Sequence, residues 1–171
     1  MIAILGLGSN MGDRRANLQA AIEDLWAHGV RAVTSSSVYE TEPVGEVTDQ
    51  PAFLNACLEV ETDLAPHELL GACKAVEAAL GRKLSGPGYV RHGPRPIDVD
   101  ILLLDETVVH TPDLRVPHPE LTHRRFVLVP LVELAGDVEV PGHGRAADAL
   151  AKLPGDGQDV RRAGPPLEVT G

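Results

Sequence analysis

The chain has 171 residues, of which 43% are hydrophobic and 23% charged, and its formal net charge is -10 at pH 7. This length suits one domain with a substantial core, and the acidic balance argues against a general nucleic-acid binder, because phosphate backbones require a basic face. No apolar run is long enough to cross a bilayer, and the N-terminus lacks the basic flank and cleavage site of a signal peptide, so we expect a cytoplasmic protein without a membrane partner.

The first 39 residues predict a strand, a helix and a second strand. Residues 2–7 are continuously apolar, which is typical of a central strand covered on both faces. Asp13 can cap a following helix that ends at Gly29. The apolar positions of this helix recur at helical spacing and are Leu18, Ala21, Ile22, Leu25 and Trp26. Residues 31–39 are rich in Val, Thr and Ser and therefore indicate a second strand.

Residues 52–61 predict a third strand with two different faces. Successive side chains of a strand point to opposite faces. One face carries Leu54, Ala56, Leu58 and Val60, and the other carries Phe53, Asn55, Cys57, Glu59 and Glu61. We expect the aliphatic face to pack in the core, which places Phe53 and Asn55 together on the opposite face.

The second half of the chain predicts a helix, a strand and smaller additions. Pro66 suits a first helical turn, and the apolar stripe of this helix runs through Leu69, Leu70, Cys73, Val76 and Leu80. A long loop over 81–96 leads to a strand over 97–104. Short strands near Val108 and Val138 and helices over 125–135 and 146–153 complete a single domain over 1–153. We expect residues 154–171 to form a mobile C-terminal tail.

The order strand, helix, strand, strand, helix, strand is that of the ferredoxin-like split βαβ arrangement. We therefore expect an α+β sandwich with helices on one face of an antiparallel sheet. In the strand order 4-1-3-2, the third and fourth strands begin at the edge where the first strand ends. Phe53, Asn55, Asp98, Asp100 and the turn over 8–10 should cluster there. The third and fourth strands lie two spacings apart, roughly 10 Å, a distance that a concave site can span.

The stretch GPRPIDVDILLL, residues 93–104, places two aspartates at the start of an otherwise apolar strand. Charged side chains are rare on a core strand unless they are paired or bind metal. Asp98 and Asp100 point the same way, with Cα atoms roughly 7 Å apart. They can chelate one Mg²⁺, or share two ions as in two-metal phosphoryl-transfer sites. Alternatively, they pair with arginines and only hold a loop, and the spacing alone favours neither reading.

Arginines close to this pair favour an anion site. Arg82, Arg91 and Arg95 lie in or beside the loop just before the aspartates, and guanidinium groups bind phosphates through paired hydrogen bonds. A loop of this length in a compact domain is more often functional or disordered than inert. Because the chain has no Walker A sequence, we expect phosphate binding to depend on metal ions and arginines.

The cysteines and most histidines suggest no further metal site. Cys57 and Cys73 are the only cysteines and have no metal-ligand spacing, so we expect free, partly buried thiols. Apart from His118, the histidines form no convincing ligand set, and we therefore expect no zinc.

Several motifs resemble those of the 6-hydroxymethyl-7,8-dihydropterin pyrophosphokinase family of folate synthesis. GPRPIDVDIL is similar to the family signature G-P-R-x-x-D-x-D-I. The likeness continues, in the family's order over residues 2–135, through LGLGSNMGD, SSVYETEPVG, DQPAFLNAC, VEAALGR and VPHPELTHRRFVLVPLVELA. The resemblance implies a ferredoxin-like fold. It also implies transfer of the β,γ-diphosphate of ATP to the hydroxymethyl group of the dihydropterin, with release of AMP.

The resemblance further implies a role for individual residues. Asp98 and Asp100 would hold two Mg²⁺ ions that bridge the triphosphate, and Arg82 and Arg95 would contact the ATP phosphates and promote transfer. The other positions on the ATP side are Glu77, Arg91, Ile101, His118 and Arg124. Without the resemblance, Glu77 could equally be a solvated helix residue paired with Lys74. The pterin would stack between the chain's two phenylalanines, and its binding positions are Thr41, Pro43, Val44, Phe53, Asn55 and Phe126. A monomer is expected by resemblance only.

Three functions therefore remain to be compared. The leading one is a cytoplasmic, Mg²⁺- and ATP-dependent pyrophosphokinase that acts on the dihydropterin alcohol. A noncatalytic ferredoxin-like module that binds a nucleotide or RNA is the second, and a γ-phosphoryl kinase on the same scaffold is the third. The nucleotide product separates them, because the first predicts AMP, the third predicts ADP and the second predicts neither.

Overall fold

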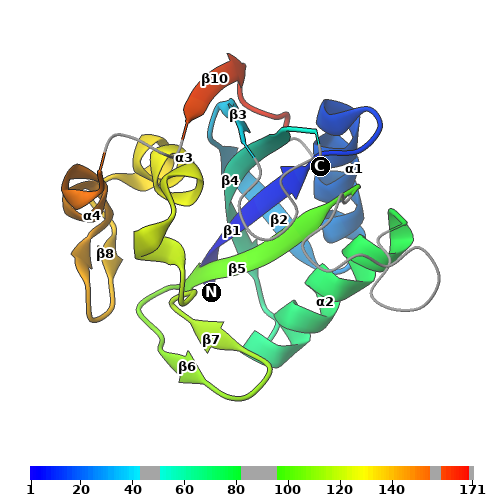
Figure 1. The fold of residues 1–171 in the computed structure, drawn as a ribbon. Helices are drawn as coiled ribbons and strands as arrows, with labels where there is room; N and C mark the ends of the chain where they lie inside the picture. The colour runs from blue at the N-terminus through cyan, green and yellow to red at the C-terminus, as the bar shows by residue number, and fades with distance from the viewer. Residues whose placement is uncertain (43–50, 82–95, 155–158, 170–171) are drawn as a thin grey trace.

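The apolar run at the start of the chain forms the centre of the main sheet. In a computed structural model, which describes residues 1–42, 51–81, 96–154 and 159–169, β1 (Ile2–Ser9) lies between β4 (Phe53–Thr62) and β5 (Asp98–Leu104). Both neighbours run antiparallel to β1 (Figure 1). The predicted third and fourth strands therefore flank the first, which brings their starts to the edge where β1 ends.

The predicted second strand over 31–39 is two strands. β2 (Val30–Ser35) and β3 (Val38–Thr41) both pair with β4, and the break between them falls at Ser36 and Ser37. Ser36 Oγ accepts the Cys57 N–H at 2.9 Å, and the Ser37 N–H and hydroxyl both donate to Glu133. Side-chain hydrogen bonds of this kind give the backbone an alternative to the ladder, which explains the break.

The antiparallel α+β class is confirmed, while the complete ferredoxin-like assignment stays a prediction. The order β5-β1-β4-β2 is the one that the split βαβ arrangement predicts. However, β3 also pairs with β4, and β10 (Val160–Gly164) pairs with β3, so the sheet extends beyond that arrangement.

Two helices cover one face of the sheet. α1 (Arg14–Ala27) begins after Asp13, whose carboxylate accepts the Ala16 N–H at 3.1 Å, as the sequence predicts for a cap. α2 (Pro66–Ala79) has its proline in the first turn. Both helices pack on the aliphatic face of β4, where Leu58 and Val60 are fully buried. Trp26 was expected in the apolar stripe of α1, and this expectation is wrong, because its side chain is 50% exposed.

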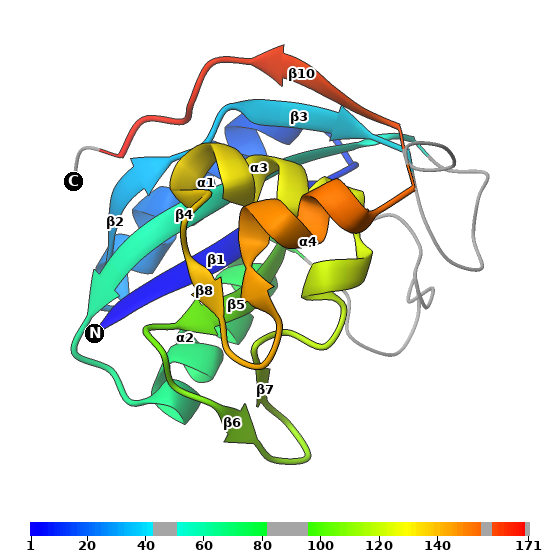
Figure 2. The same cartoon turned by 90° about the vertical axis from the view of Figure 1, so that its left-hand side faces the viewer.

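The described residues cover only part of the opposite face of the sheet. α3 (Arg125–Ala135) lies over it, α4 (Ala146–Lys152) packs on α3, and β8 (Glu139–Val140) and β9 (Gly144–Arg145) form a short hairpin on the same side (Figure 2). A second short hairpin, β6 (Val109–His110) and β7 (Arg115–Val116), lies beside β5 and near α2, where Val116 belongs to the main core. Leu128 and Leu131 of α3 form a second core with Leu103 of β5. The expectation that helices cover one face only is therefore wrong. The part of this face that the described residues leave open holds the candidate site.

The C-terminal segment has regular structure, in contrast to the expected mobile tail. Residues 159–169 include β10 and continue along α1, where Arg15 donates to the carbonyls of Pro165 and Pro166. Leu167 is 4% exposed and belongs to the main core. Its N–H donates to Ser35 Oγ at 3.1 Å. The hydrophobic side chain explains the docking, because burying it removes apolar surface from water.

Leu167→Ala is expected to lower the free energy of unfolding by about 2–4 kcal/mol, because the truncation leaves a cavity in the main core. Urea unfolding with a constant m-value measures this change. Val169→Ala is the matched control, since Val169 is only partly buried against the same core, and we expect it to cost about 1 kcal/mol or less. Equal unfolding midpoints for Leu167→Ala and the unchanged chain would show that the segment does not dock.

The two cysteines are free, as expected, and they are fully rather than partly buried. Burial raises the pKa of both, that of Cys73 to about 12, so both stay protonated and unreactive at neutral pH. Across the described ranges, every helix is too short or too polar to cross a membrane.

Candidate active site

A cavity of about 340 Å³ opens on the partly covered face of the sheet. Its lining residues come from β1, β3, β4, α2, β5, α3 and the segments before α3. They are Gly8, Thr41, Glu42, Phe53, Asn55, Lys74, Asp98, Asp100, Leu102, His118, Arg124, Phe126 and Val127. The predicted cluster of Phe53, Asn55, Asp98 and Asp100 is therefore confirmed as a spatial group, as strand parity and the strand order require.

The floor of the cavity is a glycine of the central strand. Gly8 of β1 lies directly between Asn55 of β4 and Asp98 of β5 in the sheet register. Gly6, two residues earlier, lies between Cys57 and Asp100. Because neither glycine has a side chain, the polar side chains of the two flanking strands face a common open space.

Asp98 and Asp100 occupy the cavity side of β5. Both are partly exposed, whereas Val99 and Ile101 between and after them are buried in the main core. This alternation explains how two carboxylates lie on a strand that otherwise reads as buried. Within the described residues, no group of three or more His, Cys, Asp or Glu side chains is placed to hold a metal ion. Two carboxylates beside an open cavity nevertheless fit Mg²⁺, which takes one or two protein carboxylates and completes its shell with water and substrate phosphates.

Glu77 of α2 lies beneath the strand that carries the aspartates. Its side chain is completely buried, and one carboxylate oxygen accepts the Val99 N–H at 2.8 Å. Lys74 Nζ lies 3.4 Å from the other oxygen. The reading of Glu77 as a solvated helix residue is therefore wrong, although the expected pairing with Lys74 is present. The contact with Val99 anchors β5 between the two aspartates.

The opposite part of the cavity is aromatic. Phe53 of β4 and Phe126 of α3 both line it and are partly exposed. The Arg124 guanidinium lies 5.6 Å from the centroid of the Phe126 ring, within cation–π range. Beside Phe53, the Asn55 amide donates to Thr41 Oγ1 at 2.6 Å across β4 and β3. These groups offer flat apolar faces and one hydrogen-bonding edge.

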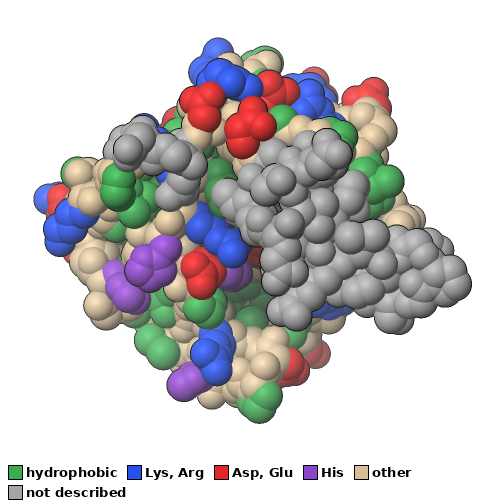
Figure 3. All heavy atoms as spheres, in the orientation of Figure 1, with side chains coloured by type: hydrophobic (Ala, Val, Ile, Leu, Met, Phe, Trp, Pro, Cys, Tyr) green, Lys and Arg blue, Asp and Glu red, His purple; other side chains and the backbone are tan. Residues whose placement is uncertain are grey.

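A second cavity, of about 260 Å³, adjoins the first. Its lining residues are Leu70, Lys74, Val99, Asp100, Ile101, Pro112, Asp113, Leu114, Arg115, His118 and Pro119. Lys74, Asp100 and His118 line both cavities. Figure 3 shows basic, acidic and histidine side chains gathered on this face of the molecule. The two cavities therefore meet at a carboxylate and two nitrogen-bearing side chains.

His118 is held neutral at this junction. Burial, together with the charge of Arg124, lowers its pKa below the ordinary value, against smaller effects of Asp98 and Glu120. Its Nδ1 lies 3.1 Å from the Glu120 backbone nitrogen and accepts that N–H. The neutral ring therefore carries its proton on Nε2, which makes Nε2 a hydrogen-bond donor.

The remaining predicted site residues fall into two groups. Glu77 and Ile101 lie next to the site, the first beneath β5 and the second in the wall of the second cavity. The residues Pro43, Val44, Arg82, Arg91 and Arg95 lie outside the described residues.

Three cavity residues were not predicted from the sequence as parts of the site: Glu42, Lys74 and Leu102. Leu102 follows from strand parity with Asp98 and Asp100. Lys74 lies one helical turn before Glu77, a spacing that was read only as an ion pair. Gly8 was expected near the aspartates as part of the turn over 8–10, and it lies there as a residue of β1.

Comparison with known proteins assigns the chain to a family. The model of the 7,8-dihydro-6-hydroxymethylpterin-pyrophosphokinase (HPPK) family matches residues 4–136. The chain belongs to the HPPK family. It is 47% identical over 152 residues to a 2-amino-4-hydroxy-6-hydroxymethyldihydropteridine pyrophosphokinase of Methylorubrum extorquens, a match that covers 88% of this chain and 92% of that protein. A protein of the same description from Bacillus subtilis is 46% identical, with 81% and 80% covered.

Other HPPK relatives are longer. The chain covers 28% of a folate synthesis bifunctional protein of Arabidopsis thaliana, to which it is 42% identical over 80% of its own length. A crystal structure of a Plasmodium falciparum HPPK-DHPS protein has a TM-score of 0.68 and 16% identity, and covers 88% of this chain and 45% of that one. At this identity, the structure supports the fold alone. The chain therefore spans most of its HPPK relatives from the two bacteria and less than half of the bifunctional ones.

Proposed function

We propose that the two adjoining cavities form the active site at which this chain carries out the reaction of its family. In that reaction a pyrophosphoryl group moves from ATP to 6-hydroxymethyl-7,8-dihydropterin, a step of folate biosynthesis. The main observation in support of the proposal is that the two cavities share lining residues. Asp100, Lys74 and His118 line both cavities, so one molecule in each cavity would meet at a carboxylate and two donors.

The first cavity suits the pterin. A bicyclic, planar ring needs aromatic faces and a hydrogen-bonding edge, and Phe53, Phe126 and Asn55 line the same space. The second cavity suits the nucleotide, because the predicted ATP-side residues Ile101 and His118 line it. With Nδ1 occupied by the Glu120 N–H, His118 would offer Nε2–H to a phosphate oxygen.

Asp98 and Asp100 would hold two Mg²⁺ ions at the junction. When bound, these ions neutralise charge on the triphosphate and lower the pKa of the substrate hydroxyl. The chain itself positions the reacting groups: the phenylalanine side chains orient the pterin, and Lys74 and Arg124 add positive charge beside the phosphates. The hydroxymethyl oxygen attacks the β-phosphorus, the bond from that phosphorus to the bridging oxygen of AMP breaks, and the hydroxyl proton is lost.

Product analysis tests the reaction directly. Incubation with ATP, Mg²⁺ and the dihydropterin should release AMP and the pterin diphosphate in equal amounts. ³¹P NMR distinguishes these products from those of a γ-phosphoryl kinase, which would give ADP and a pterin monophosphate. Release of ADP would refute the proposed reaction type, and release of neither nucleotide would favour a noncatalytic binding module.

Phe53→Ala is expected to weaken pterin binding by roughly tenfold, because stacking of a base-like ring on an aromatic side chain contributes about 1–3 kcal/mol. ATP affinity should stay within twofold, since Phe53 lines only the first cavity. Isothermal titration with each substrate separates the two effects. A greater loss of affinity for ATP than for the pterin would contradict the assignment of the cavities.

The cellular setting stays a proposal. We propose a cytoplasmic monomer that acts on two small molecules and binds neither membrane nor nucleic acid. The acidic net charge of -10 supports the expected lack of a nucleic-acid partner. Size-exclusion chromatography with light scattering measures the oligomeric state.

A further inference from the structure

β10 lies beside the wall of the first cavity, although it falls outside the residues that match the HPPK family model. In the sheet register, Val160 is opposite Thr41, and Thr41 is in turn opposite Phe53. Thr41 and Phe53 both line the cavity. Only β3 therefore separates β10 from β4, the strand that carries Phe53. Phe53 is the aromatic side chain on which the pterin is proposed to stack.

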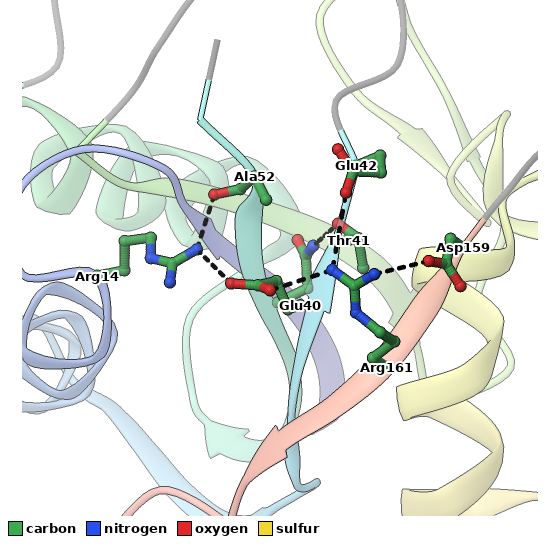
Figure 4. A network of polar contacts seen from close by, with 8 residues as sticks. Arg14, Glu40, Thr41, Glu42, Ala52, Asp159 and Arg161 are labelled. Carbon is green, nitrogen blue, oxygen red and sulfur yellow. Dashed lines mark hydrogen bonds and ion pairs between the residues drawn. The ribbon is translucent and has the colours of Figure 1, made fainter.

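Arg161 of β10 joins the acidic residues on either side of Thr41 (Figure 4). Its guanidinium lies 3.1 Å from a carboxylate oxygen of Glu40 and 3.7 Å from one of Glu42. A third contact, of 2.8 Å, reaches Asp159. Thr41 is thus flanked in the sequence by two carboxylates that share one cation.

The network continues to β4. Arg14 binds the second carboxylate oxygen of Glu40 at 2.9 Å and also donates to the Ala52 carbonyl at 2.9 Å. Hydrogen bonds from Arg14 and Arg161 hold the pKa of Glu40 below its usual range, so the carboxylate is charged at neutral pH. Arg161 and Arg14 therefore connect the ends of β3 and β4 that border the cavity.

Thr41 connects the ion pairs of Arg14 and Arg161 with the cavity. It is 2% exposed, and its hydroxyl accepts the amide N–H of Asn55, which is 8% exposed. This bond fixes which end of the Asn55 amide faces the cavity, because a buried amide without a partner is costly. We propose that Arg161 is a positioning residue for pterin binding, which acts through Glu40 and Glu42 on the Thr41–Asn55 pair. The inference rests on the proposed function.

The physical basis is charge balance at the end of β3. Without the guanidinium, Glu40, Glu42 and Asp159 are left as three carboxylates that lose their common partner and repel one another. Repulsion moves the end of β3 and disturbs the Thr41–Asn55 bond. Exposed ion pairs are individually weak, so the expected effect of a network of three is moderate, roughly three- to tenfold in affinity.

Steady-state kinetics with Arg161→Met tests the inference. We expect the KM for the dihydropterin to rise roughly three- to tenfold, while kcat and the KM for ATP stay within twofold. A purely structural role would change all three values together or lower the thermal midpoint alone. Arg161→Lys, which restores a point charge but not the planar fork, should recover part of the pterin affinity. If Arg161→Met does not fold, the same kinetic measurements are made with Arg161→Lys.

Arg145→Met is the matched control. The Arg145 side chain is also 53% exposed and contacts two carboxylates, those of Asp137 and Asp148, but it lines neither cavity. Its kinetics should equal those of the unchanged chain. If the unchanged chain is active and Arg161→Met has the same pterin KM as Arg145→Met, the inference is overturned while the proposed function stands. If the unchanged chain does not turn over the dihydropterin at all, both are overturned.

Discussion

Asp98→Asn and Asp100→Asn are each expected to lower kcat by about a thousandfold or more, which corresponds to roughly 4 kcal/mol of lost transition-state stabilisation. Each substitution preserves the shape of the side chain but removes one of the two negative charges that would hold Mg²⁺ beside the triphosphate. Because both side chains lie on the cavity side of β5 rather than in the core, the fold should be retained. Kinetics at increasing Mg²⁺ concentration and circular dichroism measure the two effects separately.

Asp105→Asn provides the control for these two variants. Asp105 follows the same strand and accepts the Ile2 N–H at 3.1 Å, but it lines neither cavity. An asparagine preserves the acceptor oxygen for this bond, so we expect activity near that of the unchanged chain. Full activity of Asp98→Asn or Asp100→Asn at ordinary Mg²⁺ concentration would contradict metal binding by the pair.

Gly8→Ala is expected to raise the KM for the dihydropterin roughly tenfold to a hundredfold. A Cβ atom at this position would lie 2.8 Å from Asn55 Oδ1 and 3.5 Å from the Phe53 ring. Asn55 could give way only by breaking its 2.6 Å bond to Thr41, since its side chain is buried. Overpacking of this kind costs about 1–3 kcal/mol. Here it displaces side chains that line the proposed pterin cavity and so weakens pterin binding. Steady-state kinetics with the dihydropterin as the varied substrate measure the effect.

Gly6→Ala separates the steric effect from the general effect of a β1 substitution. Gly6 lies two residues earlier on the same side of the strand, and a Cβ atom there would meet the Leu102 side chain at 3.4 Å, an ordinary contact. Both substitutions reduce the freedom of the unfolded chain equally. We expect Gly6→Ala to change the pterin KM by less than about threefold. Equal kinetics for the two variants would show that Gly8 does not border the pterin.

Strand parity, together with the strand order, was sufficient to predict which side chains meet at the centre of the candidate site. The alternation of Leu54 and Leu58 with Phe53 and Asn55, and of Val99 and Ile101 with the aspartates, fixes which side chains face away from α1 and α2. The strand order then brings the two sets to the same edge of the sheet. Such inferences depend on local periodicity and on a small number of allowed topologies.

Other features depend on contacts between distant segments and could not be read from local sequence. The C-terminal segment docks through Leu167 in the main core and through the pairing of β10 with β3, more than 100 residues away in the chain. Its Gly- and Pro-rich surroundings resemble those of a mobile tail. The break at Ser36 and Ser37 depends on Glu133 of α3. The role of Gly8 depends on the side chains of the two flanking strands, since a glycine itself carries no chemical signal.

The most direct test of the site is a crystal structure with Mg²⁺, a non-hydrolysable ATP analogue and the dihydropterin. We expect carboxylate oxygens of both Asp98 and Asp100 about 2.0–2.1 Å from Mg²⁺, with the pterin ring between Phe53 and Phe126. Cations bound only by nucleotide and water, with both carboxylates facing away from them, would contradict the account.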